Sequence, residues 1–220
     1  MKLIDLSLTI QGHWRWAIQQ KHILAHSADD PYQVTTINLP MHAFTHVDTP
    51  LHIIPGRISI DAVPLEDLAG PAAVLDLTYV KANQEIERGD LEKVASHIQK
   101  NDIVLLKTAW DQTRNPMSHE YWTEAPYVGE GAAIWLGNQP IKAVGFDFPQ
   151  DYVIREIPQR HPLPEEMPTH HHILAKGIYL IEYLCNLHQI EKERITFFAL
   201  PLKVRDAEGA PTRALAMVDE

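Results

Sequence analysis

Short apolar segments rich in β-branched residues recur along the whole chain, and they constrain its fold more than any other feature. Polar stretches with proline or glycine separate them, a pattern typical of strands. None approaches the roughly 20 apolar residues of a membrane span. The predicted strands cover residues 2–10, 32–40, 72–80, 102–110, 141–149, 177–184 and 195–204.

Between these strands, three stretches are suited to short helices, at 89–99, 118–126 and 168–177. Thr169 stands where it could cap the start of the last one, and Gly177 where it could end it. No glycine-rich phosphate loop accompanies them. We therefore expect a mixed, strand-rich α/β fold rather than a doubly wound one.

The chain is long enough for one well-packed domain, and we expect residues 1–220 to form a single unit. Its composition of 45% hydrophobic and 22% charged residues is that of a globular protein. The net charge of -10 disfavours binding to nucleic acid or to anionic membranes. We expect a small-molecule substrate, and neither nucleic acid nor a membrane as partner.

The single cysteine, Cys185, excludes an intrachain disulfide and suits a reducing compartment. Its apolar surroundings favour a buried thiol over a nucleophile. Asp5 interrupts the first apolar stretch, so the N-terminus does not resemble an export signal. We expect a cytoplasmic protein.

Residues 42–52, HAFTHVDTPLH, place three histidines and an aspartate at even-numbered positions. Prolines on both sides and β-branched residues within make a helix unlikely to form here. In an extended chain, all four side chains would share one face. This donor set suits Zn²⁺, with Mn²⁺, Co²⁺ or Fe²⁺ as alternatives, although a solvent-facing polar strand would show the same pattern.

Strand spacing separates the roles of these residues. Cα atoms of His46 and Asp48 would lie about 6.6 Å apart in a strand, close enough to share an ion, whereas those of His42 and His46 would lie roughly 13 Å apart. Binding by both histidines therefore requires a bend over 42–46. His52 follows Pro50 and would be free to act as an acid/base.

A second group of candidate ligands follows much later. Glu182 stands in the apolar run GIYLIEYL, where a buried carboxylate would need a partner or an ion unless the strand lies at an edge. His170, His171 and His172 precede this strand in a predicted helix, and only one or two of them can point the same way. Spacing within the triplet does not choose among them.

Together, HAFTHVDTPLH, HHHILAKGIYLIEYLCNL and LPLKVRDAEGAPTRALA resemble the cyclase or kynurenine formamidase-like family of metal-dependent hydrolases, whose signature is H-x-G-T-H-x-D-x-P-x-H. The resemblance extends along nearly the whole chain. It implies a swivelling β/β/α fold, assembly as dimers or larger homo-oligomers, and one or two metal ions per subunit.

The resemblance also implies roles for the site residues. His42, His46 and Asp48 would hold one ion, and Asp48 would bridge to a second ion held by His170 and Glu182. His52 would be the general acid/base. The implied reaction is hydrolysis of a carbon–nitrogen bond in an arylformamide such as N-formylkynurenine.

Three aromatic residues bear on the substrate. Phe44 replaces the signature glycine, and we expect its ring on the ligand face to make the pocket narrower or differently shaped. Trp14 and Trp16 could stack on an aromatic substrate or serve a subunit interface. Hydrolysis of a cyclic amide such as isatin, or of an ester, is the alternative within enzymes, and a metal- or ligand-binding module without catalysis is the alternative outside them.

Overall fold

Most of the chain is organised around one mixed sheet, as the strand-rich sequence predicts. The computed structural model describes residues 1–27, 30–157 and 159–218. The strands are β1 Lys2–Asp5, β2 Gln19–Leu24, β3 Val34–Asn38, β4 His46–Asp48, β5 Ala69–Asp76, β6 Glu85–Ile86, β7 Ile103–Lys107, β8 Tyr127–Val128, β9 Ala143–Phe146, β10 Tyr179–Glu182, β11 Arg194–Pro201 and β12 Gly209–Val218. The α-helices are α1 Arg88–Val94, α2 Trp110–Thr113, α3 His119–Thr123, α4 Glu130–Gly137 and α5 Pro168–His172.

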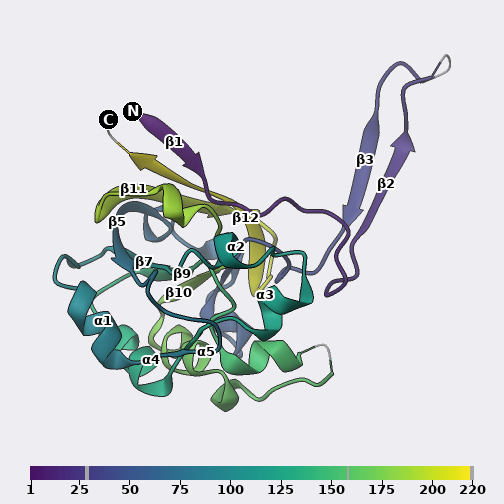
Figure 1. Cartoon of the computed structure of the whole chain (residues 1–220). Coiled ribbons are helices and arrows are strands. Elements are labelled where there is room, and N and C mark those ends of the chain that lie inside the picture. The colour runs from purple at the N-terminus through teal and green to yellow at the C-terminus, as the bar shows by residue number, and fades with distance from the viewer. Residues whose placement is uncertain (28–29, 158, 219–220) are drawn as a thin grey trace.

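The main sheet closes on itself. Its strand order is β1-β12-β11-β5-β7-β9-β10-β4, and β4 also pairs with β12. The pairs β5–β7, β7–β9 and β9–β10 are parallel, while the remaining neighbours run antiparallel. Seven strands therefore form a barrel-like ring, with β1 added beside β12 (Figure 1). The expected mixed α/β, strand-rich fold is confirmed.

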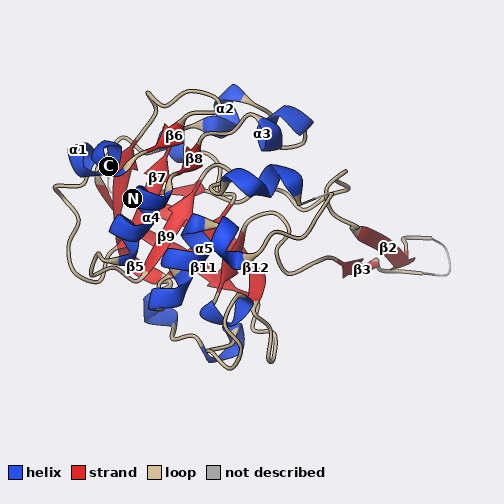
Figure 2. Ribbon diagram, turned by 90° about the horizontal axis from the view of Figure 1, so that it is seen from below, coloured by secondary structure: helices blue, strands red, loops and turns tan. Residues whose placement is uncertain are grey.

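Alternation along the central strands divides the core between the two faces of the sheet. Val104 and Leu106 of β7 join the cluster that packs beneath the helices, whereas Ile103 and Leu105 join the cluster inside the ring. Helices α1, α4 and α5 lie together on the first of these faces (Figure 2). The core thus has one helix-covered layer and one layer enclosed by the sheet.

All seven predicted strands are present, most within narrower bounds, and helices occur in the three predicted stretches. The predicted cap is wrong, because Met167 occupies the N-cap position and Thr169 lies inside α5. The hydroxyl of Thr169 donates to Asp151 instead. Gly177 does end the following 3-10 turn, with a φ of 82°.

The hairpin of β2 and β3 stands apart from the rest of the molecule. Both strands project from the body in two perpendicular views (Figures 1 and 2), and nearly all their side chains are exposed. The segments at its base, 11–18 and 39–45, lead back to the ring. These segments border the cavity described below.

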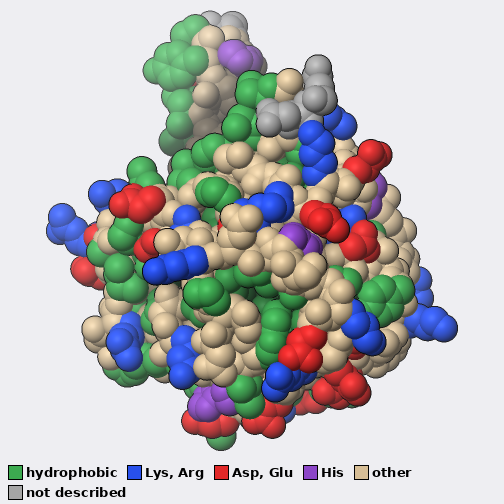
Figure 3. Space-filling view, turned by 90° about the vertical axis from the view of Figure 1, so that its left-hand side faces the viewer, with side chains coloured by type: hydrophobic (Ala, Val, Ile, Leu, Met, Phe, Trp, Pro, Cys, Tyr) green, Lys and Arg blue, Asp and Glu red, His purple; other side chains and the backbone are tan. Residues whose placement is uncertain are grey.

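The charged surface has no single sign on the face drawn in Figure 3, where lysine and arginine side chains lie among aspartate and glutamate. Within the described parts of the chain, no helix is long and apolar enough to cross a membrane.

Close strand packing at Gly145 offers a test of the ring. A Cβ at this β9 position would come within 2.7 Å of Leu105 Cδ2 and 2.8 Å of Leu184 Cδ1. We expect Gly145→Ala to lower the free energy of unfolding by about 1–3 kcal/mol through overpacking. Gly89→Ala in α1, where nothing lies within 4 Å, should leave it unchanged or raise it by about 0.5–1 kcal/mol. Urea denaturation measures both, and an unchanged Gly145→Ala would contradict the packing.

Candidate metal centre

A three-residue strand, β4, carries the centre of the candidate site. It lies between β10 and β12, and the antiparallel register places His46 opposite Glu182 and Asp48 opposite Gly209. Because alternate residues of a strand share a face, the side chains of His46, Asp48 and Glu182 gather on one side. All three are buried. Since β10 lies between β9 and β4, Glu182 is not on an edge strand.

The predicted bend between His42 and His46 is present. Residues 41–45 form a turn and bends before β4 begins. This bend returns His42 to the strand, so that its Nδ1 lies 2.7 Å from Asp48 Oδ1 and its Nε2 lies 3.1 Å from Glu208 Oε1. His52 ends a 3-10 turn, and its ring stacks on that of His42 with centroids 4.0 Å apart.

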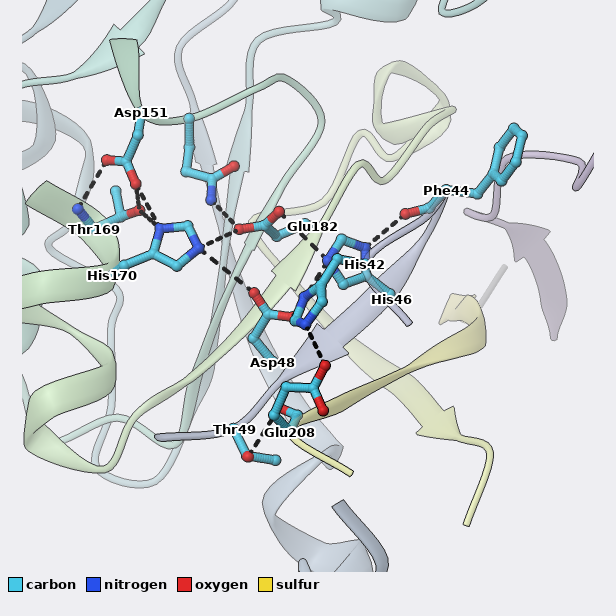
Figure 4. Close-up of polar contacts among 11 residues, drawn as sticks. His42, Phe44, His46, Asp48, Thr49, Asp151, Thr169, His170, Glu182 and Glu208 are labelled. Atoms are coloured by element: carbon cyan, nitrogen blue, oxygen red, sulfur yellow. Dashed lines mark hydrogen bonds and ion pairs between the residues drawn. The ribbon is translucent and has the colours of Figure 1, made fainter. Parts of the chain in front are cut away.

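Four further distances connect the side chains of the cluster, and two of them join the two parts of the sequence (Figure 4). His46 Nε2 lies 3.2 Å from Asp48 Oδ1 and 3.5 Å from Glu182 Oε2. His170 Nε2 lies 3.2 Å from Glu182 Oε1 and 3.6 Å from Asp48 Oδ2. Two ligand atoms bound tetrahedrally to one ion at about 2.1 Å would be separated by about 3.4 Å. The spacing therefore fits metal ligands.

Unsatisfied polar atoms at the same place support this fit. Among the described residues, His46 Nε2 and both carboxylate oxygens of Asp48 are buried and make no hydrogen bond of good geometry, although His42 Nδ1 lies 2.7 Å from Asp48 Oδ1. Buried polar atoms without partners are uncommon and call for an ion or another ligand. Two donor groups can be drawn here, His42–Asp48–His52 and His46–Asp48–Glu182, which share Asp48.

Of the three consecutive histidines, His170 is the one that the structure brings to the cluster. It is buried, and its Nδ1 lies 2.6 Å from Asp151 Oδ2. His172 instead lies near Glu130, at 3.4 Å. The ring of His171 packs edge-on against His172, with centroids 4.7 Å apart.

Neighbouring groups fix the direction of the ligand side chains. His46 Nδ1 lies 2.7 Å from the carbonyl oxygen of Phe44, and His170 Nδ1 faces the Asp151 carboxylate. Donation from each Nδ1 leaves each Nε2 free for an ion. The side-chain amide of Gln150 donates to the carboxylate of Glu182 and so orients this third ligand group. Gln150 and Asp151 were not predicted, although both follow a predicted strand in the polar stretch FDFPQD, which could have indicated them.

Opposite charges determine the ionisation of this cluster. Burial alone would lower the pKa of His42, but the adjacent Asp48 carboxylate raises it to about 9. Burial would raise the pKa of Asp48, yet the charges of His42 and His46 hold it well below its usual range. Burial lowers the pKa of His52 to about 4, so its imidazole stays neutral. Asp48 is thus a carboxylate beside a neutral His52.

The cluster forms the floor of a cavity of about 360 Å³. His42, Asp48, His52, His170 and Glu182 all reach it. Its remaining walls are largely apolar, apart from one arginine and one further histidine: Arg15, Trp16, Pro40, Ile154, Ile157, His161, Pro162, Met167 and Tyr183. The cavity can therefore hold a small molecule with an apolar body against a polar, charged floor.

Only one of the three predicted aromatic residues lines this cavity, Trp16. Trp14 is 39% exposed, and its ring stacks on His119 with centroids 3.7 Å apart. Phe44 also lies outside the cavity, because its ring turns away from the ligands (Figure 4) and packs on Trp16 at 4.7 Å. The expectation that the Phe44 ring lies on the ligand face is thus wrong, and Phe44 adjoins the cavity only by packing on Trp16.

The backbone explains why Phe44 points away. Its φ is 58°, in the left-handed region that glycine adopts freely. The position keeps the glycine conformation despite carrying a large side chain, which directs the ring out of the ligand face and the carbonyl toward His46. Tyr183, next to Glu182, has a similar φ of 57°.

Comparison with known proteins agrees with this geometry. A family model described as "Putative cyclase" matches residues 4–150, about two thirds of the chain. The chain belongs to this Cyclase family, as its motifs predicted.

Similar proteins are hydrolases. A kynurenine formamidase from Bordetella petrii is 27% identical over 206 residues, covering 93% of this chain and 86% of its own. The structure of a predicted metal-dependent hydrolase from Bacillus stearothermophilus matches with 27% identity and a TM-score of 0.75, over 98% and 97% of the two chains. Isatin hydrolase A from Labrenzia aggregata shares the fold, with a TM-score of 0.82 over 100% and 94% at 23% identity. The protein is an enzyme, a hydrolase of this family.

Strain at Phe44 can be measured by comparing glycine with alanine. An L-residue in the left-handed region costs about 1–2 kcal/mol, which glycine avoids. We expect Phe44→Gly to be more stable than Phe44→Ala by about 1 kcal/mol, although both lose the buried ring. At neighbouring Ala43, whose φ is not positive, Ala43→Gly should instead be destabilising by about 0.5–1 kcal/mol. Equal stability of the two Phe44 variants would contradict the strain.

Proposed function

We propose that this hydrolase cleaves a carbon–nitrogen bond in a small amide, with arylformamides such as N-formylkynurenine as its substrate class. The observation that carries the proposal is the buried cluster of histidine and carboxylate side chains, with unsatisfied ligand atoms, at the floor of a largely apolar cavity. The similarity to kynurenine formamidases supports the choice of substrate.

His42, His46 and Asp48 would hold one divalent cation, and Asp48, His170 and Glu182 would hold a second. The mixture of imidazole and carboxylate ligands favours Zn²⁺, at one or two ions per subunit, with Mn²⁺ as the alternative. Such an ion, when bound, lowers the pKa of water and polarises a carbonyl oxygen. Phe44 and Asp151 orient His46 and His170 so that Nε2 of each faces the ion.

His52 is the group that we assign to proton transfer. Its ring lines the cavity between His42 and His170, with centroids 4.0 Å and 5.6 Å away. A neutral imidazole can accept the proton of the attacking water and return it to the leaving nitrogen. Trp16 lines the same cavity and would pack against an aromatic leaving group.

Cyclic amides, esters and binding without catalysis are the other outcomes that a substrate panel would distinguish. Turnover of formamides only would support the proposal, whereas a bound metal with no turnover on any compound would support a binding module. We further propose that the protein is cytoplasmic and forms a homo-oligomer. Light scattering of the purified protein would test the number of subunits.

Substitutions should separate the ligands from the acid/base. We expect His46→Ala and Glu182→Gln to lose bound metal, and with it turnover of N-formylkynurenine by about 100-fold or more. We expect His52→Gln to retain the metal while its kcat falls by about 10²–10⁴-fold. His171→Gln is the matched control outside the cluster. Elemental analysis measures the bound metal, and formate release measures the turnover. Undiminished activity of His46→Ala would disprove the metal mechanism.

Asp151 should control the metal affinity of His170. Replacing this carboxylate removes the charge that holds His170 Nδ1, so we expect Asp151→Asn to weaken metal binding by about 10–100-fold. Asp102→Asn is the control, because Asp102 is equally buried but pairs with Arg194 away from the site. Competition with a chelating dye measures the affinity, and equal affinity in Asp151→Asn and the wild type would refute this role.

A further inference from the structure

Arg15 is a charged wall residue of the cavity that the mechanism above does not use. It stands between Trp14 and Trp16 in the segment leading to the β2–β3 hairpin, and it lines the cavity with Glu182 and Tyr183. The guanidinium carbon lies 4.6 Å above the ring of Trp122. Arg15 Nη2 also donates to the carbonyl oxygen of Ile154 at 2.7 Å. The guanidinium is thus held in place from two sides.

The guanidinium of Arg15 forms no direct ion pair. Among the described residues, no carboxylate lies within ion-pair distance of it, and Glu182 in the same cavity attracts its charge only at longer range. Its Nη1 atom is buried and has no hydrogen-bond partner among these residues. An arginine stays protonated in a protein, so the cavity wall carries a cation without a directly bonded carboxylate.

A purely structural clamp would not require this arrangement. The contacts with Trp122 and Ile154 use one face of the guanidinium and one of its nitrogens, and they leave Nη1 without a hydrogen-bond acceptor. A buried polar atom without a partner calls for one. A carboxylate is the anion whose two oxygens match the fork of a guanidinium.

We propose that Arg15 determines specificity by binding a carboxylate of the molecule in the cavity, so that the enzyme prefers amides that carry or generate this group. This inference rests on the proposed amide hydrolysis. The apolar walls at Ile154, Ile157 and Met167 would take the body of the molecule, while the metal ligands face its carbonyl.

The carboxylate can come from two sources. In an open-chain formamide, water adds to the formyl carbon, the carbon–nitrogen bond breaks, the nitrogen receives a proton, and the acyl group leaves as formate, so a carboxylate on the larger fragment must already be part of the substrate. In a cyclic amide, the same step leaves the acyl group attached to the product as a new carboxylate. Arg15 would bind the substrate in the first case and the product in the second.

A binding experiment tests the proposal without catalysis. The probes are 2-aminobenzoate and its neutral counterpart 2-aminobenzamide, titrated calorimetrically into the metal-loaded protein. We expect Arg15→Met to weaken binding of the benzoate by about tenfold or more, with the benzamide unchanged within about twofold, because only the first loses a charge-assisted pair. Arg15→Lys should recover part of the loss.

Arg155→Met is the matched control. Arg155 also covers an aromatic ring, that of Tyr152 at 3.8 Å, and donates to a backbone carbonyl, but it does not line the cavity. This variant should leave the affinities for 2-aminobenzoate and 2-aminobenzamide unchanged. Equal weakening of both probes by Arg15→Met would show a structural clamp, and unchanged benzoate binding would exclude contact with the anion; either result overturns the proposal.

Kinetics then identify the source of the carboxylate. If the substrate supplies it, Arg15→Met should lower kcat/KM for N-formylkynurenine by about tenfold or more through KM, but not that for 2-formamidoacetophenone, which lacks the group. If the product supplies it, turnover of isatin should show weaker product inhibition in the variant. A wild type that hydrolyses none of these compounds would refute the proposed function, while the calorimetric result would still decide the role of Arg15.

Discussion

The pairing of β4 with two strands at once is the constraint on which the rest of the structure depends. This short strand joins β10 to β12 and thereby closes the sheet into a ring. The same pairing buries His46 and Asp48 and aligns Glu182 opposite His46. Gly209 allows the close approach of β12, since a Cβ there would meet the Val47 carbonyl oxygen at 2.7 Å. The strand pairings that close the ring therefore also assemble the site.

The sequence predicted the parts of this structure whose signals are local. Apolar, β-branched runs identified five strands of the ring, β5, β7, β9, β10 and β11, and the HAFTHVDTPLH motif identified the donor groups on β4 together with the bend before it. Among the elements that escaped prediction, three have a clear physical reason. Strand β2 is polar and exposed on both faces, β12 contains Gly209 and Pro211, and α4 has glycine at its N-cap in place of a capping side chain.

The supporting residues of the site could not be predicted because their roles come from tertiary packing. Gln150 and Asp151 follow β9, and only the neighbouring β10 and the nearby α5 bring them to Glu182 and His170. Arg15 reaches the cavity because Trp122 and Ile154, both distant in sequence, hold it there. Phe44 shows another limit: the motif placed its ring on the ligand face, whereas the left-handed backbone that the structure shows turns the ring toward Trp16.

The groups that orient His46 and His170 differ in charge, so the two sides of the cluster are electrostatically different. A neutral carbonyl, that of Phe44, faces His46, whereas a buried carboxylate, that of Asp151, faces His170. A carboxylate makes the imidazole behind it a stronger electron donor than a carbonyl does. The carboxylate behind His170 is the fully buried Asp151, whereas the carboxylate beside His42 is the partly exposed Glu208, 3.1 Å from its Nε2. The better-shielded negative charge therefore lies on the side of His170 and Glu182, and the side of His42 and His52 opens on the cavity.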